Sequence, residues 1–224
     1  SDWWIEQEGM YADSLHLDGQ PRFDGHWTVL LPVLTGIAAP ERAQRVLQRI
    51  AREWVDEWGM IHTRGADRRV WTLPTGLLAL AVFRHGDADT GIRLLRNIGA
   101  TARHGTAGTL KELIPQGLCF IQLWSAALFV QGITEGIFGV SPQAQRHELV
   151  IEPHLPSGWS TATLHGLRVG DHILDLHVTP EYADIRHRRG DTSLLAHYRS
   201  ATDQPWCETR IAPGDRALLK AGNE

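Results

Sequence analysis

Glu112 is the residue of this chain whose type and setting best suit chemistry. It is a lone carboxylate in a glycine-rich loop, and the apolar helix expected after this loop carries Gln122 and Trp124 near its start. A loop carboxylate can take part in proton transfer, and an indole ring offers a flat apolar face to a pyranose. The segment 108–125 therefore favours a sugar site, although solvated loop acids and buried tryptophans produce the same pattern.

The composition is that of an ordinary globular protein. The chain has 224 residues, enough for one large domain or two small ones, with 42% hydrophobic and 21% charged residues. A net charge of -4 without a basic run argues against nucleic acid as the main partner. Nine tryptophans indicate either a well-packed helical core or aromatic platforms for a sugar.

Neither the cysteines nor the histidines show the spacing of a metal or redox site. Cys119 and Cys207 are far apart, so no disulfide framework is expected. The chain has no Cys-x-x-Cys or paired-His motif. Four of its histidines, which lie far apart in the sequence, are His62, His85, His104 and His154. We therefore expect no metal and no cofactor.

The hydropathy and the first residues of the chain suggest where the protein is located and whether the chain is a fragment. No apolar run approaches bilayer length and no signal peptide is visible, so we expect no membrane partner and a cytoplasmic location. The chain starts with Ser1 and three further residues that read like the interior of an element. We expect it to be a fragment whose upstream part is missing.

Helical periodicity dominates residues 1–140. The clearest helix starts at Pro40, with apolar residues recurring at three-to-four spacing. Short turns, such as the one at 85–87, predict antiparallel hairpins with the longer loops emerging together at the opposite end. Stacked hairpins with site-bearing loops at one rim predict an α/α toroid. The expected helices span residues 27–37, 40–54, 74–83, 87–102 and 120–138.

The pattern changes to a period of two after residue 140. Leu174, Leu176 and Val178 alternate with polar residues, which is typical of a half-buried strand. The expected strands span residues 149–153, 174–178, 183–187, 194–198 and 217–220. Domain 141–224 is thus expected to be a small antiparallel β-sandwich. The expected fold class is mainly α with this β appendage.

Five stretches, in their order and spacing, resemble a known family. They are residues 8–19, 69–74, 108–125, 149–156 and 164–170. The chain resembles the C-terminal part of the six-hairpin (α/α)6-barrel glycoside hydrolases, most closely the bacterial glycogen-debranching (amylo-α-1,6-glucosidase-type) proteins. The resemblance implies that residues 1–140 are the C-terminal part of the barrel and that residues 141–224 are its β-sandwich.

The resemblance also implies a mechanism and a site. It implies an inverting glycosidase acting on an α-glucan or related oligosaccharide, in which one carboxyl group protonates the leaving oxygen and a second activates water. Glu112 would be the general base, and the general acid would lie upstream of residue 1. The other expected site residues are Trp71 and Trp124 as sugar platforms, Gln122 and Arg69 as hydrogen-bond donors, and Asp13. The missing part of the barrel or a second chain would cover the helical face.

Two other function classes remain open. The first is a non-catalytic carbohydrate-binding or structural half that packs on a catalytic partner. The second is a toroid of different chemistry, such as a sugar epimerase or a polysaccharide lyase, which would use His or Tyr as the base. Two of the three tyrosines, Tyr182 and Tyr198, fall in the expected β domain, which argues against the second class.

Overall fold

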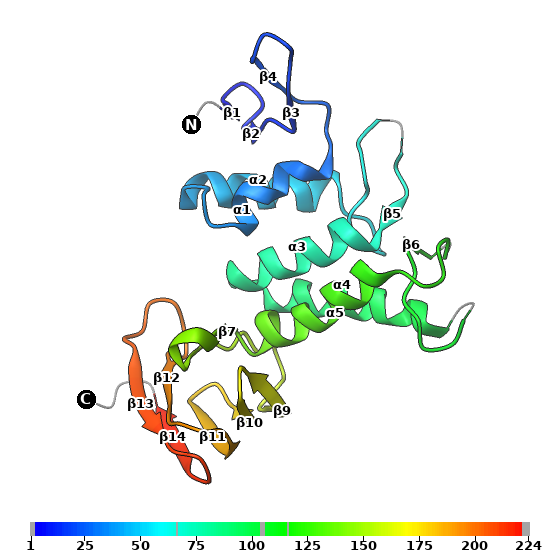
Figure 1. The fold of residues 1–224 in the computed structure, drawn as a ribbon. Coiled ribbons are helices and arrows are strands. Elements are labelled where there is room, and N and C mark those ends of the chain that lie inside the picture. The colour runs from blue at the N-terminus through cyan, green and yellow to red at the C-terminus, as the bar shows by residue number, and fades with distance from the viewer. Residues whose placement is uncertain (1–2, 66, 104–105, 116, 221–224) are drawn as a thin grey trace. The chain divides into compact units, whose positions relative to one another are not determined.

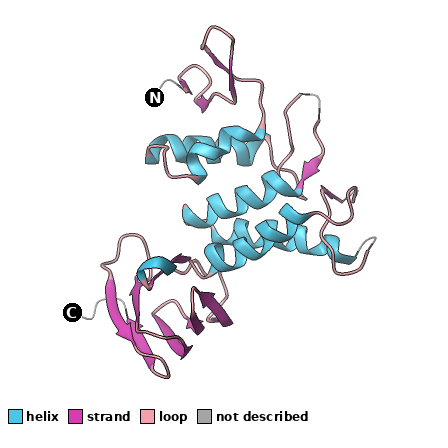
Figure 2. Cartoon of the chain, viewed as in Figure 1, coloured by secondary structure: helices cyan, strands magenta, loops and turns pink. Residues whose placement is uncertain are grey.

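The computed structural model describes residues 3–65, 67–103, 106–115 and 117–220. The chain forms two compact units, Ser1–Gly132 and Ile133–Glu224. The α-helices lie in the first unit, and both four-stranded sheets lie in the second (Figure 2).

The first unit combines helices with short strand pairs. Its helical elements are η1 (Trp27–Leu30), α1 (Leu31–Leu34), α2 (Pro40–Glu53), α3 (Thr72–Arg84), α4 (Ala88–Ala100), η2 (Thr101–Arg103) and α5 (Leu123–Gln131). Its strands are β1 (Trp4–Ile5), β2 (Met10–Tyr11), β3 (Ser14–Leu15), β4 (Pro21–Arg22), β5 (Val70–Trp71) and β6 (Leu113–Ile114). The strands pair as β1 with β2, β3 with β4, and β5 with β6.

Local sequence signals explain where the helices α2 and α4 begin. Pro40 occupies the first turn of α2, and the buried face of this helix carries Ala43, Val46 and Ile50. Asp87 caps α4, because its side chain accepts a hydrogen bond from the Thr90 N–H at 3.0 Å. The predicted helices 40–54 and 87–102 are confirmed to within two residues at each end.

Helix α3 is the central element of the first unit. Nearly all of its residues are buried, and it packs against both α4 and α5, which lie beside it in Figure 1. The tight turn at 85–87 joins α3 to α4 as a hairpin, as the sequence predicted. None of the helices among the described residues combines the length and apolar character that crossing a membrane would require.

The expectation of a mainly α chain built on a partial (α/α)6 toroid is wrong. Strands and helices occupy nearly equal shares of the described residues. The segment 27–37 forms one 3₁₀ turn and one short α-helix, and the segment 120–138 holds only α5 followed by a π-helical stretch, η3 (Gly132–Ile137). The prediction that both segments are apolar and partly helical is confirmed, but the predicted length of regular helix is too great.

The second unit contains two four-stranded sheets. One has the strand order β14-β11-β10-β9 and the other β13-β12-β8-β7. The strands are β7 (Val140–Gln143), β8 (Glu148–Ile151), β9 (Ala162–Val169), β10 (His172–Val178), β11 (Tyr182–Arg189), β12 (Leu194–Tyr198), β13 (Cys207–Ile211) and β14 (Arg216–Lys220). A short 3₁₀ helix, η4 (Ala144–Arg146), joins β7 to β8.

Alternate residues are buried in three of the four central strands, β8, β10 and β12. In β10 the buried positions are His172, Leu174, Leu176 and Val178, so the predicted period of two is confirmed. The prediction of purely antiparallel strands is wrong at one place, because β12 pairs with β8 in parallel. Periodicity carries no information on strand direction, and this pair is joined through three strands of the other sheet.

Candidate functional site

The strand pair β5–β6 brings Trp71 and Glu112 together. Trp71 pairs with Leu113 in antiparallel register. The Thr72 N–H donates to the Glu112 carbonyl oxygen at 2.8 Å, and the Thr72 hydroxyl oxygen lies 3.1 Å from the same carbonyl oxygen. The main chain of Glu112 is therefore fixed beside Trp71, although the two residues are far apart in the sequence.

A buried hydroxyl network adds the start of α5 to this arrangement. The Thr72 and Ser125 hydroxyls are hydrogen-bonded to each other, and Ser125 donates to the Lys111 carbonyl oxygen at 2.8 Å. Both hydroxyl side chains are fully buried. Trp71, Glu112 and Trp124 are each sequence neighbours of this network, which therefore connects the three segments that carry them.

Lys111 organises the loop that carries Glu112. Its side chain is fully buried, and its ammonium group donates to the Thr109 carbonyl at 2.7 Å, the Thr109 hydroxyl at 2.8 Å and the Thr106 carbonyl at 3.2 Å. The ammonium also lies 5.7 Å from the centre of the Phe120 ring. Because a buried charge must be hydrogen-bonded, the loop folds around this one group.

Asp67 and Arg69 form a two-point ion pair next to Trp71. The Arg69 Nε and Nη2 groups each donate to Asp67 at 2.8 Å, and the Trp71 indole N–H donates to Asp67 at 3.2 Å. The Arg69 bonds hold the pKa of the Asp67 carboxyl far below its usual range. The same pairing raises the pKa of Arg69, and the nearby Glu112 carboxylate adds to this rise. The Glu112 carboxylate thus lies within electrostatic reach of Arg69.

An open cleft of about 740 Å³ lies along this part of the first unit. Its polar wall is formed by Asp56, Asp67, Arg68 and Arg69, and Trp58 supplies an aromatic surface. Glu112 and Trp71 lie beside this cleft rather than in its wall. Among the described residues, none donates a hydrogen bond to the carboxylate of Glu112, which is a half-buried residue.

His62 packs on one face of Trp71, and His26 packs against His62. The His62 ring stacks on Trp71 with the centroids 4.4 Å apart, and the His26 ring meets His62 edge-on at 4.8 Å. Burial lowers the pKa of both histidines, so both are neutral near pH 7. The Nδ1 atom of His62 is buried and has no hydrogen-bond partner among the described residues. A sugar stacking on Trp71 must therefore use the face opposite His62.

Asp13 organises a turn. Its Oδ2 atom accepts the backbone N–H groups of Asp24, Gly25 and His26 at 2.8–2.9 Å. These bonds hold His26 in position for its contact with His62. The structure therefore gives Asp13 a positioning role, and direct contact of Asp13 with a substrate stays a prediction.

Gln122 and Trp124 lie at the N-terminus of α5. Gln122 is the N-cap residue, and its N–H donates to the Leu110 carbonyl oxygen at 3.0 Å. Trp124 is 38% exposed. No ring contact between Trp124 and Trp71 is found in the described part of the chain. Both residues lie where the loop that carries Glu112 leads into α5, and their roles in sugar binding stay predictions.

Sequence reasoning missed several residues around Trp71 and Glu112. His62 and Asp67 lie in the polar segment between two predicted elements, and we interpreted that segment only as a loop. A signal was present, because an aspartate two residues before an arginine and four before a tryptophan supplies an acceptor for both. Nothing in the sequence marked Lys111 as buried, since an isolated lysine in a glycine-rich loop is normally solvated.

One family model matches part of the chain. Residues 144–200, in the second unit, match the model described as Glycosyl hydrolase family 65, C-terminal domain. The matched segment includes all of the strands β8–β12. No curated protein matches the chain.

Several solved structures share a partial likeness with the chain. One is a putative kojibiose phosphorylase from human microbiome, with 12% identity and a TM-score of 0.46, covering 66% of this chain. Another is the GH63 mannosylglycerate hydrolase from Thermus thermophilus in complex with glucose, with 20% identity and a TM-score of 0.43, covering 58% of this chain. The chain spans 18% of the first protein and 36% of the second.

Proposed function

We propose that this chain is part of an inverting glycoside hydrolase that acts on an α-glucan or a related oligosaccharide, and that Glu112 is its general base. The family 65 match of residues 144–200 supports a carbohydrate-active protein. The observation that carries the proposal is the hydrogen bond from the Thr72 N–H to the Glu112 carbonyl oxygen, at 2.8 Å. It fixes the main chain of Glu112 beside the segment that carries Arg69 and Trp71.

The roles of the neighbouring residues follow from their chemistry. The face of Trp71 opposite His62 stacks on a pyranose ring, and Trp124 offers a second aromatic surface. Arg69 and Gln122 donate hydrogen bonds to sugar hydroxyl groups. Glu112 accepts a proton from the attacking water.

A general acid must come from outside this cluster. An acid that protonates the leaving oxygen needs a raised pKa, because it must be protonated at the working pH. Asp67 is unsuited, since its ion pair with Arg69 lowers its pKa. Asp13 uses one oxygen to accept three backbone N–H groups. We propose that another part of the protein supplies the acid, at about 6.5–9.5 Å from the base.

The decisive variant is Glu112→Gln in the full-length protein. Loss of a general base lowers turnover by about 10²–10⁴-fold. Release of glucose from α-linked oligosaccharides measures the rate, and NMR of the first product measures its anomeric form, which should be β for an inverting enzyme. Glu41→Gln, an exposed change in the first turn of α2, is the matched control and should leave turnover unchanged. Wild-type turnover by Glu112→Gln would remove Glu112 from the mechanism.

A non-catalytic carbohydrate-binding role is the second candidate. It is favoured by the fact that Asp13, Asp56 and Asp67 all use their carboxylates in bonds to the protein itself. In this case the chain binds oligosaccharide through Trp71 while another chain performs the chemistry. Glu112→Gln would then leave turnover intact, whereas Trp71→Ala would weaken binding.

A further inference from the structure

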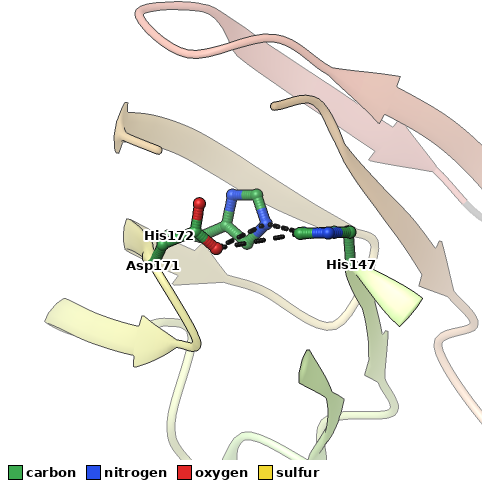
Figure 3. A group of neighbouring side chains, drawn as sticks. All are labelled: His147, Asp171 and His172. Carbon is green, nitrogen blue, oxygen red and sulfur yellow. Dashed lines mark hydrogen bonds and ion pairs between the residues drawn. The ribbon is translucent and has the colours of Figure 1, made fainter. Parts of the chain in front are cut away.

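Three histidines form a continuous hydrogen-bonded series in the second unit. His147 Nδ1 lies 2.9 Å from His172 Nε2, and His172 Nδ1 lies 3.1 Å from His187 Nε2. His187 Nδ1 ends the series at the Ile211 carbonyl oxygen, 2.9 Å away. His172 and His187 are fully buried, whereas His147 reaches the surface. Figure 3 shows the outer end of the series, with His147, His172 and Asp171 turned toward one another.

The carbonyl of Ile211 determines the tautomers of the inner rings. A carbonyl only accepts, so His187 carries its proton on Nδ1 and offers Nε2 as an acceptor. His172 must then donate from Nδ1, which leaves its Nε2 lone pair directed at His147. A lone pair on Nε2 is what a metal ion requires from a histidine.

Asp171 completes a group of three donor atoms. Its Oδ1 atom lies 3.6 Å from His172 Nε2 and 3.9 Å from His147 Nδ1, too far for hydrogen bonds. Its other oxygen is held in place by the Asp191 backbone N–H at 3.1 Å. The three donor atoms all lie within 4.8 Å of one another.

The separations fit a tetrahedral ion. Zinc with ligand bonds of about 2.0–2.1 Å places neighbouring donor atoms about 3.3–3.4 Å apart. The separations of 2.9, 3.6 and 3.9 Å lie on both sides of this value. Two imidazole nitrogens select zinc and its neighbours over magnesium and calcium, which prefer oxygen. We propose that His147, Asp171 and His172 bind a divalent transition metal of the zinc class, with a fourth position open to water.

The surrounding structure supplies the outer support of such a site. A metal-bound histidine usually donates its second ring N–H to a neighbouring acceptor, and His172 donates to His187 in this way. His147 has a left-handed backbone (φ 54°, ψ 42°), and the Leu195 N–H holds its carbonyl at 2.9 Å. A non-glycine residue held in this conformation is typical of functional positions.

The metal would connect the two sheets. His147 lies directly before β8, in one sheet, whereas Asp171 and His172 lie at the start of β10, in the other. A bound ion therefore acts as a cross-link between the sheets. Because binding stabilises only the folded form, metal should raise the unfolding temperature of this unit.

The test is zinc binding by the tag-free full chain after treatment with a chelator. Isothermal titration with Zn²⁺ should give one site per chain, and Mg²⁺ should give no binding. His147→Ala and Asp171→Asn should each weaken zinc binding at least 10-fold, since even the loss of an outer-shell partner costs about 10–100-fold. Both side chains are partly exposed, so neither variant removes buried packing. His172 is left intact because it is fully buried.

His165→Ala is the matched control, because His165 also pairs with an aspartate, Asp175, at 3.4 Å on the surface of the same unit. It should bind zinc as the wild type does. Co²⁺ provides a second readout, since the visible bands of a tetrahedral site should appear in the wild type and vanish in His147→Ala. The proposal is overturned if the wild type fails to bind zinc. It is equally overturned if His147→Ala and Asp171→Asn bind like His165→Ala.

Discussion

Thr72 and Ser125 are hydrogen-bonded to each other through their buried hydroxyl groups. Thr72 begins α3 and Ser125 lies in the first turn of α5, so this bond joins the N-termini of two helices. Because Ser125 also donates to the Lys111 carbonyl, the loop that carries Glu112 depends on the same bond. The position of the loop around Glu112 is thus maintained by buried residues that would not touch a substrate.

Ser125→Ala tests this dependence. The change leaves the Lys111 carbonyl without its buried donor and removes one of the two partners of the Thr72 hydroxyl, so the free energy of unfolding should fall by about 1–3 kcal/mol. Urea denaturation measures the loss. Thr35→Ala, which removes an exposed hydroxyl bonded to the Leu31 carbonyl, is the control and should cost less than about 1 kcal/mol. Equal losses in the two variants would show that the hydroxyl network has no special importance.

Trp71→Ala should weaken oligosaccharide binding by about 1 kcal/mol or more, since the stacking surface is lost. Trp71→Phe keeps an aromatic ring and should lose less. Titration calorimetry with a maltooligosaccharide measures both. Trp206→Ala is the control, because Trp206 is an exposed tryptophan of the second unit that stacks with an arginine. Unchanged affinity in Trp71→Ala would assign Trp71 to packing against His62 alone.

The ion pair of Asp67 with Arg69 predicts a pH-dependent contribution to stability. The folded-state pKa of Asp67 is lowered, so its contribution is complete above the unfolded pKa of about 3.9 and is lost as the pH falls toward the folded pKa. The stability difference between wild type and Asp67→Asn should therefore be constant from about pH 7 to pH 5 and shrink below about pH 4. Urea denaturation across this range measures it. A difference that grows on acidification would contradict the pairing.

Lys111→Met keeps an unbranched side chain of nearly the same length but removes the ammonium group. The Thr109 carbonyl then loses its donor and the Thr106 carbonyl loses one of its donors, so the free energy of unfolding should fall by about 1–3 kcal/mol. Lys220→Met, at an exposed position of β14, should change it by less than about 0.5 kcal/mol. Thermal and urea unfolding measure both. A variant Lys111→Met as stable as the wild type would show that methionine packing replaces the hydrogen bonds.

Gly190→Ala tests the packing of the histidine series. A Cβ atom at this position would lie 2.6 Å from both His172 Nδ1 and His187 Nε2. One of the buried rings must move, so the variant should be destabilised by about 1–3 kcal/mol. Gly65→Ala is the control, since nothing lies within 4 Å of its Cβ position. Calorimetric unfolding compares the two, and equal melting temperatures would show that the rings tolerate the methyl group.

The sequence predicted those elements whose signals are local. Pro40 and Asp87 mark the starts of α2 and α4 because a first-turn proline and a capping aspartate act within one turn. The alternation in β10 marks its buried face for a similar reason. That alternation also contained an unused signal, since His172 lies two residues before Leu174 and must share its buried face.

The remaining features depend on contacts between distant segments. The bond between Thr72 and Glu112 follows from the pairing of β5 with β6. Strands of only two residues leave no recognisable pattern in the sequence, so this pairing could not be predicted. The approach of His147 to His172 depends on how one sheet meets the other. Spacing along the sequence relates each histidine only to its near neighbours, whereas these histidines come from distant segments that meet only in the folded chain.

The parallel pairing of β8 with β12 has a consequence for synthesis on the ribosome. β8 is synthesised early, but its neighbour β12 follows only after β9, β10 and β11, which belong to the other sheet. During that interval the hairpin of β7 and β8 exposes an unpaired edge, which is where nascent chains associate wrongly. Translation must therefore reach at least Tyr198 before this edge is protected, and a pause before that point would favour aggregation over productive folding.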